Sequence, residues 1–198
     1  RDSHERWILD NCVANQRWWG SHKDTGLTID YGGLQTFVQY CVQRYERTGE
    51  QIYLDLASEC TYFNFFEHCP KQLEWLWHYS KGGIQEQSNY LQPDIDTMDN
   101  LPLYSWYRLA QETGDSFLMG WVDQAVFTTM HSLCDDPNDP WYGSWAQYLV
   151  DYTGAVQRLD RNPVTENPTK YAGSITPSLI EDLLLLNDAG YEIPSSLD

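Results

Sequence analysis

One pattern, in which apolar residues lead to a threonine-glycine turn and then to a second apolar run, occurs twice along this chain. The first copy turns at Thr48-Gly49 and the second at Thr113-Gly114, which lies 65 residues further on. On both sides of each turn the apolar residues recur at helical spacing. Because a short connection forces consecutive helices to lie antiparallel, each copy predicts a helical hairpin. The apolar positions are Leu34, Phe37, Val38, Cys41, Val42, Tyr45, Tyr53, Leu56, Ala57, Cys60 and Phe63 in the first copy, and Leu103, Tyr104, Tyr107, Leu109, Phe117, Leu118, Trp121, Val122, Ala125 and Val126 in the second.

The two turns match in chemistry as well as in place. Thr48-Gly49-Glu50 corresponds to Thr113-Gly114-Asp115, and an aromatic residue follows each turn within a few positions. Hairpins that recur at one period are typical of repeat proteins, in which each unit buries its apolar face against the next. We therefore expect residues 1–198 to form one all-α domain of tandem antiparallel hairpins.

Other segments carry weaker patterns. Residues 145–152, ahead of Thr153-Gly154, suggest a third repeat whose second helix is less clear. Thr176-Pro177 supplies an N-cap and a first-turn proline for a helix that runs to Gly190. Residues 5–19 also suggest a helix. Long loops are expected at 20–33, 82–100 and 134–144, and loops of that length are often functional.

Composition and charge restrict the partners. The chain of 198 residues is 41% apolar and 21% charged, which is ordinary for a globular protein. A formal net charge of -17 repels phosphate backbones and anionic lipids, and no apolar run approaches the ~20 residues that span a bilayer. We therefore expect neither nucleic acid nor a membrane as partner. A strongly anionic polysaccharide is also disfavoured, unless basic residues such as Arg158, Arg161 and Lys170 gather in one groove.

The chain gives little sign of a metal or a cofactor. None of the five cysteines lies at zinc-finger spacing, and Cys41 and Cys60 fall on apolar stripes, where free thiols behave as small hydrophobic groups. The sequence also allows one disulfide bond among the five cysteines. The acidic loop at residues 135–139 could hold calcium, but its oxygen-bearing residues are not spaced as in an EF-hand, and a solvated turn is favoured. Its oxygen-bearing residues are Asp135, Asp136, Asn138 and Asp139. Motifs for serine hydrolases, nucleotide binding and zinc proteases are missing from the sequence.

The sequence opens at Arg1, without an initiator methionine or a signal peptide. We expect that a leader was removed or that this is a piece of a longer polypeptide, and the repeats favour the piece. An extracellular or periplasmic location is the favoured one.

Hairpins that turn at Thr-Gly-Asp or Thr-Gly-Glu, with an aromatic residue soon after, resemble those of the six-hairpin glycosidase-like superfamily. The resemblance covers mainly residues 30–66 and 94–133. It implies an (α/α) toroid, in which sugars bind at the end where the loops entering the inner helices converge. A complete toroid has more hairpins than are visible here, so the resemblance also implies completion by the rest of a longer chain or by a partner chain.

Within that superfamily, the stretch from Asp99 to Leu103 is similar to one in unsaturated uronyl hydrolases, where an aspartate ahead of an inner helix acts as general acid and base. This implies that role for Asp99, or for Asp96 in a shifted register. The Leu-aromatic-Met pattern usual in that family is replaced here by Asn100-Leu101-Pro102-Leu103.

The distribution of carboxylates along the sequence also favours a site at residues 94–99. Asp94, Asp96 and Asp99 are the densest carboxylate cluster, and like charges brought close together raise one pKa enough for a general acid. Glycoside hydrolysis uses a pair of such groups. The alternative is that these aspartates are solvated loop residues or helix caps.

Asp30-Tyr31 holds the equivalent place before the first repeated helix, and His22 lies eight residues before Asp30. On a toroid these residues would share a rim with Asp99. A histidine and a tyrosine there would also suit a lyase, in which a base removes the proton next to a uronate carboxylate. The alternative is a capping aspartate and a packed tyrosine.

The chain has nine tryptophans and fourteen tyrosines, whose flat faces and polar edges suit sugar rings. Packing in the core is the alternative use. The aromatic residues in or near expected loops are Trp18, Trp19, Trp75, Trp77, Trp141, Tyr142 and Trp145.

We therefore predict a glycoside hydrolase that acts on an oligosaccharide or polysaccharide. A lyase of the same fold ranks second, because it must neutralise a uronate carboxylate and this chain has few basic residues. A non-catalytic module that binds glycan or protein is the third possibility. The helices that begin near Leu34 and Leu101 should be adjacent and roughly parallel, and Asp30 and Asp99 should open toward one cleft that a loop tryptophan also faces.

Overall fold

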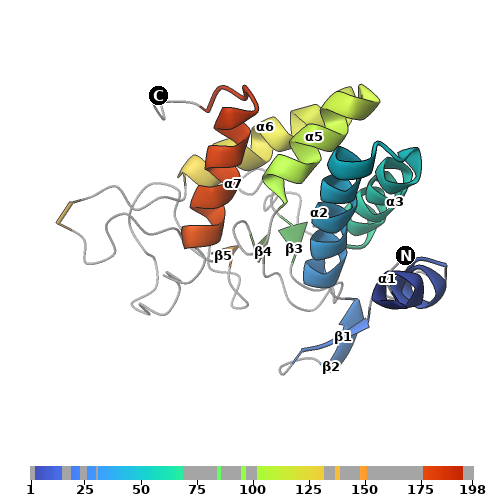
Figure 1. The fold of residues 1–198 in the computed structure, drawn as a ribbon. Helices are drawn as coiled ribbons and strands as arrows, with labels where there is room; N and C mark the ends of the chain where they lie inside the picture. Colours follow the sequence, from blue (N-terminus) through green and yellow to red (C-terminus); the bar gives the residue numbers. More distant parts are fainter. Residues whose placement is uncertain are drawn as a thin grey trace.

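Both predicted hairpins are present in the computed structural model, which is mainly helical (Figure 1). The first consists of α2 (Tyr31–Thr48) and α3 (Gln51–His68). The second consists of α5 (Leu103–Thr113) and α6 (Ser116–His131). The structure describes residues 3–14, 19–22, 26–29, 31–68, 84–85, 95–96, 102–131, 137–138, 148–150 and 176–193.

A left-handed glycine ends the first helix of each hairpin. Gly49 has φ 66° and Gly114 has φ 70°, a region that residues with a Cβ atom enter at a cost. The N–H of Gly49 donates to the carbonyl of Tyr45 at 2.7 Å, and the N–H of Asp115 donates to the carbonyl of Ala110 at 3.0 Å. These bonds satisfy carbonyls at the helix end, so the glycines predicted to stop the helices do so in the structure.

The predicted apolar stripes form the core between the hairpins. The largest fully buried side chains are Trp106, Tyr53, Leu103, Leu109, Leu118 and Leu186. Cys41 and Cys60 are buried free thiols, as the sequence predicts. The stripe prediction is wrong at Phe117, whose side chain is 59% exposed. Phe117 lies in the first turn of α6, beside the connection, where the hairpins do not enclose it.

A further helix, α7 (Thr176–Asp188), packs against α5. It begins at the predicted Thr176, and Gly190 follows it with φ 88°, so this predicted helix is confirmed. Figure 1 shows that α2, α5 and α7 run in the same general direction, with their glycine turns toward the top of the view. Since α2 also contacts α5, the prediction that these two helices are adjacent is confirmed, whereas α5 is tilted away from a parallel arrangement in Figure 1.

The N-terminal segment is partly as predicted. Within the expected helix at residues 5–19, the structure has α1 (Ser3–Ile8) and a π-helix (Leu9–Val13), and β1 (Trp19–His22) then begins. β1 pairs antiparallel with β2 (Gly26–Ile29), so the expected loop at 20–33 contains a strand hairpin. Its strands have four residues each, which is too short for a clear alternating pattern in the sequence.

A second sheet joins distant segments. It consists of β3 (Ile84–Gln85), β4 (Ile95–Asp96) and β5 (Tyr148–Val150), in that order and antiparallel. The expected loop at 82–100 thus holds two short strands. The prediction of a helix over 145–152 is wrong at β5, because pairing with β4 determines the backbone there and the aromatic and β-branched residues of this segment also suit a strand.

Candidate functional site

The predicted site lies where the first helix of each hairpin begins. β2 ends at Ile29 and α2 begins at Tyr31, while β4 precedes the start of α5 at Leu103. In Figure 1 the five strands lie toward the lower end of the view, where α2 and α7 begin and away from the glycine turns. We call this the strand end of the helices.

The structure places the backbone of some predicted site residues. Trp19 pairs with Ile29 across the β1–β2 ladder, so its backbone lies beside the segment that enters α2 at Tyr31. His22 pairs with Gly26, three positions further along the ladder, or about 10 Å from the level of Trp19. The strand pairing therefore brings Trp19 close to the start of α2 and leaves the backbone of His22 further from it.

Asp96 lies in β4, the central strand of the second sheet, where it is paired with Ile84 on one side and Tyr148 on the other. The backbone of Asp96 is thus paired with a neighbouring strand on both sides. The remaining predicted site residues lie outside the described part of the chain, and their roles stay predictions. They are Asp99, Asp30, Trp18, Trp75, Trp77, Trp141, Tyr142 and Trp145.

A partly buried carboxyl group that no sequence pattern indicates lies at the start of α5. Asp182 of α7 accepts a hydrogen bond from the N–H of Leu103 at 2.9 Å, whereas Pro102, at the N-cap position, provides no side-chain cap. Burial raises the pKa of Asp182 to about 7, although the backbone N–H groups of Leu103 and Tyr104 act in the opposite direction. The start of α5 is therefore capped by a carboxyl group whose pKa burial raises well above its ordinary value.

An unsatisfied polar side chain lies in the first turns of α2. Gln35, four residues after Tyr31, has 0% of its surface exposed, and neither its amide nitrogen nor its amide oxygen has a hydrogen-bond partner in the structure. Burying such a group costs roughly 1–3 kcal/mol. A polar group kept at this cost is a candidate for binding a ligand hydroxyl.

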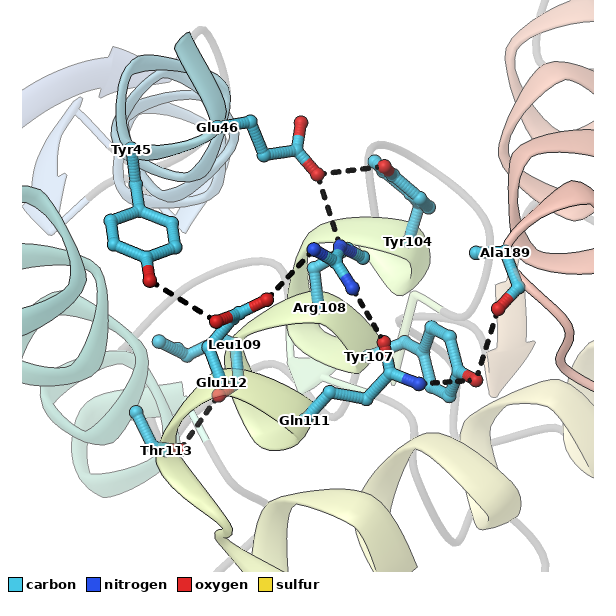
Figure 2. A network of polar contacts seen from close by, with 10 residues as sticks. All are labelled: Tyr45, Glu46, Tyr104, Tyr107, Arg108, Leu109, Gln111, Glu112, Thr113 and Ala189. Carbon is cyan, nitrogen blue, oxygen red and sulfur yellow. Dashed lines mark hydrogen bonds and ion pairs between the residues drawn. The ribbon is translucent and has the colours of Figure 1, made fainter. Parts of the chain in front are cut away.

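A polar network joins the last turns of α2 to α5 (Figure 2). Arg108 donates from Nε to Glu46 at 3.0 Å and from Nη2 to Glu112 at 2.8 Å. Tyr104 also donates to Glu46, at 2.8 Å, and Tyr45 donates to Glu112, at 3.1 Å. The guanidinium group is therefore engaged by two carboxylates, and the network sets how α5 lies on α2.

The same network continues to α7 (Figure 2). Arg108 donates from Nη1 to the side-chain oxygen of Gln111 at 2.7 Å, and Gln111 donates to the hydroxyl of Tyr107 at 2.7 Å. That hydroxyl donates to the carbonyl of Ala189 at 3.4 Å. One network thus links the last turns of α2, the length of α5 and Ala189, which follows α7.

A second buried carboxylate ties α1 to the first hairpin. Glu5 is 4% exposed and accepts hydrogen bonds from Tyr53 at 2.9 Å and from Tyr40 at 3.1 Å. Arg44 donates to the hydroxyl of Tyr53 at 3.3 Å, and its guanidinium lies 5.3 Å from the centre of the Tyr53 ring. Burial and the bond to Glu5 raise the pKa of Tyr40. No local pattern revealed this cluster, because its members are separated by 35 and 48 residues.

Comparison with known proteins gives no relative. No family model matches the chain, and no curated protein matches it. The resemblance to six-hairpin glycosidases therefore rests on the turn residues of the sequence.

Within the described residues, no cluster of three or more histidine, cysteine or acidic side chains is arranged to hold a metal ion. None of the helices in that part of the chain is both long enough and apolar enough to cross a bilayer.

Proposed function

We propose that this chain is part of a carbohydrate-active (α/α) toroid and that it hydrolyses glycosidic bonds by carboxylate general acid/base chemistry. The observation that carries the proposal is that α2, α5 and α7 run in the same general direction (Figure 1), with α5 beginning beside the last turns of α2, where Tyr104 donates to Glu46. In a toroid sugar binds at the end where the inner helices begin, and the segments that carry Asp30, Asp96 and Asp99 lead into α2 and α5.

Two described side chains support a polar ligand at this end. Gln35 offers an amide without a partner, and Asp182 offers a carboxyl group whose pKa is raised to about 7. We assign Asp182 a positioning role, because its carboxyl group caps α5 at Leu103, four residues after Asp99. The acid and base themselves are then Asp99 and Asp96, with Asp30 on the same rim.

Hydrolysis is favoured over elimination by the chemistry of the described basic residues. A lyase needs a cation that neutralises the uronate carboxylate of its substrate. Of the described arginines, Arg108 is engaged by Glu46 and Glu112 and Arg44 donates to Tyr53, while Arg6 and Arg47 lie on the exposed surface. A hydrolase with a neutral substrate needs no such cation, and the net charge of -17 suits a neutral substrate.

The catalytic test is an assay of the protein on a panel of neutral and uronic oligosaccharides, which follows reducing ends together with the absorbance of an unsaturated product. We expect reducing ends without new absorbance, and a loss of about 10²-fold to 10⁴-fold in rate for Asp99→Asn. Asp188→Asn, on the exposed surface of α7, is the matched control and should keep full activity.

Two other outcomes would replace the proposal. New absorbance that survives in Asp99→Asn but is lost in Tyr31→Phe or His22→Ala would show a lyase. A complete lack of turnover and of glycan binding would leave a non-catalytic repeat module.

Gln35 allows a test of sugar binding that does not depend on turnover. Gln35→Leu removes a buried polar group without a partner, so it should raise the free energy of unfolding by roughly 1–3 kcal/mol while it weakens binding of the same oligosaccharides. Thr61→Val is the matched control, since Thr61 is also buried and its hydroxyl also has no partner in the structure, but it lies on α3. A stabilised Gln35→Leu variant with unchanged sugar affinity would remove Gln35 from the site.

A further inference from the structure

The outward surface of α3 carries apolar and acidic side chains in one row. Ile52, Asp55, Glu59 and Tyr62 are all exposed, and their spacing of three, four and three residues puts them on one face of the helix. Ile52 is 42% exposed and Tyr62 is 38% exposed. Large apolar groups in a row with carboxylates are an unusual use of a solvent-facing helix surface.

The beginning of α6 extends this row. The rings of Tyr62 and Phe117 are stacked, with their centres 6.2 Å apart, and the Tyr62 hydroxyl donates a hydrogen bond to Asp115. Phe117 is 59% exposed and lies 6.2 Å from the ring of Trp121, which is 7% exposed. The two hairpins therefore contribute to one surface, which we call the acidic aromatic face. It consists of Ile52, Asp55, Glu59, Tyr62, Asp115 and Phe117.

The charge on this surface has one sign. Neither α3 nor α6 contains a lysine or an arginine. Partial burial alone would raise the pKa of Asp115, but hydrogen bonds from Tyr62 and from the backbone N–H groups of Leu118 and Phe117 outweigh it and lower the pKa. Asp115 is therefore charged at neutral pH beside the exposed ring of Phe117.

We propose that the acidic aromatic face docks a protein segment that presents arginine or lysine next to an apolar side chain. A guanidinium or ammonium group binds the face of an aromatic ring and is attracted by neighbouring carboxylates, here Asp55 and Glu59. Ile52 offers apolar contact beside them. Charge complementarity selects this occupant, since the same carboxylates repel anionic membranes and nucleic acids. The site is separate from the strand end, so it does not depend on the proposed catalytic activity.

The test uses a short synthetic peptide in which arginine alternates with leucine, with binding measured by titration calorimetry at low and high salt. We expect Phe117→Ala to weaken binding about tenfold or more, as for an aromatic residue central to an interface. The double variant Asp55→Asn, Glu59→Gln should also weaken binding and should reduce its salt dependence.

Phe127→Ala is the matched control. Phe127 is also an exposed phenylalanine of α6, at 49%, but it lies ten residues, or about 15 Å, further along the helix. Binding that is unchanged by Phe127→Ala and lost in Phe117→Ala supports the proposal, provided that the variants melt like the wild type. Equal losses in both variants, equal binding of a peptide with glutamate in place of arginine, or a lack of binding would each overturn it. A neutral oligosaccharide that binds in place of the peptide and is lost in Phe117→Ala would instead assign this face to glycan.

Discussion

The first and second hairpins bury the same positions but fill them with side chains of different size. Trp106 lies 65 residues after Cys41, and Ala125 lies 65 residues after Cys60, and all four are buried. The first hairpin therefore places two thiols where the second places an indole ring and a methyl group. The repeat conserves the pattern of burial and the turn, whereas the volume at each position is adjusted to what packs against it.

The hairpins also differ where their first helices begin. α2 has 18 residues and follows closely on the strand β2, while α5 has 11 residues and is capped by Asp182 from α7. The turns, which are alike, lie at the other end. The strand end is thus the part of the repeat that has diverged, as expected if the function differs from one loop to the next on a common frame.

The largest effect should come from the difference in core volume. Trp106→Ala removes a fully buried indole and should lower the free energy of unfolding by about 3–5 kcal/mol. Cys41→Ala removes a single sulfur atom at the equivalent position and should cost about 1 kcal/mol. Chemical denaturation of both variants measures the contrast. Similar losses would mean that the two hairpins do not share their core in the way the repeat implies.

The next effect concerns the remote cap of α5 and depends on pH. Because the pKa of Asp182 in the folded state, about 7, lies above the ordinary value of 3.8, the folded state binds the proton more tightly. The protonated carboxyl group of Asp182 therefore stabilises the folded state fully below pH 4, and this stabilisation is lost as the pH rises to 7. Asp182→Asn keeps an oxygen that can cap Leu103 and has no charge to bury.

The stability of Asp182→Asn relative to the wild type should therefore increase between pH 4 and pH 7, by an amount on the order of 3 kcal/mol. Thermal or chemical unfolding over this pH range measures it. Asp188→Asn, which changes an exposed carboxylate of the same helix, should show no such trend. A difference between Asp182→Asn and the wild type that stays constant with pH would show that the carboxylate is not buried at a cost.

These contrasts also explain how far the sequence could predict the fold. The turns at Gly49 and Gly114 and the apolar stripes depend on neighbours within a few positions, so the sequence shows them directly. The cap by Asp182 joins residues that are 79 apart, and the bond from Tyr53 to Glu5 joins residues that are 48 apart. Neither leaves a local pattern. The segment of β5 has residues that suit a strand, but its partner β4 lies far away in the sequence, and the helical spacing of its apolar residues was misleading.

The candidate site also combines features that local sequence predicts with features that depend on tertiary contacts. Its predicted location, ahead of the repeated helices, follows from the repeat, and the structure describes the backbones of Trp19 in β1, Tyr31 at the start of α2 and Asp96 in β4. Gln35 was not predicted, because a glutamine beside an apolar stripe looks like a solvated residue until its burial is known. Asp182 falls within a helix that the sequence predicted, but its role depends on a tertiary contact.

A smaller loss in the free energy of unfolding, equal in the two hairpins, should follow from replacing the turn glycines. Gly49→Ala and Gly114→Ala each force a Cβ atom into the left-handed region, while the space around both positions is open. Each should therefore cost about 1 kcal/mol from backbone conformation alone. Unequal losses in a urea denaturation experiment would show that one turn carries a tertiary role that the other lacks.

The smallest effect should come from the ion pair that joins the hairpins. Glu46→Gln removes the charge that meets Arg108, whose side chain is 26% exposed, while an amide oxygen can still accept from Tyr104. Since water and salt screen a pair this exposed, the loss should be below about 1 kcal/mol and should shrink in high salt. Glu59→Gln, an exposed glutamate on α3 outside this network, is the control and should change stability less than Glu46→Gln at low salt. A loss in Glu46→Gln that persists undiminished in high salt would mean that the pair is shielded from solvent and that the hairpins are held together by charge rather than by the apolar core.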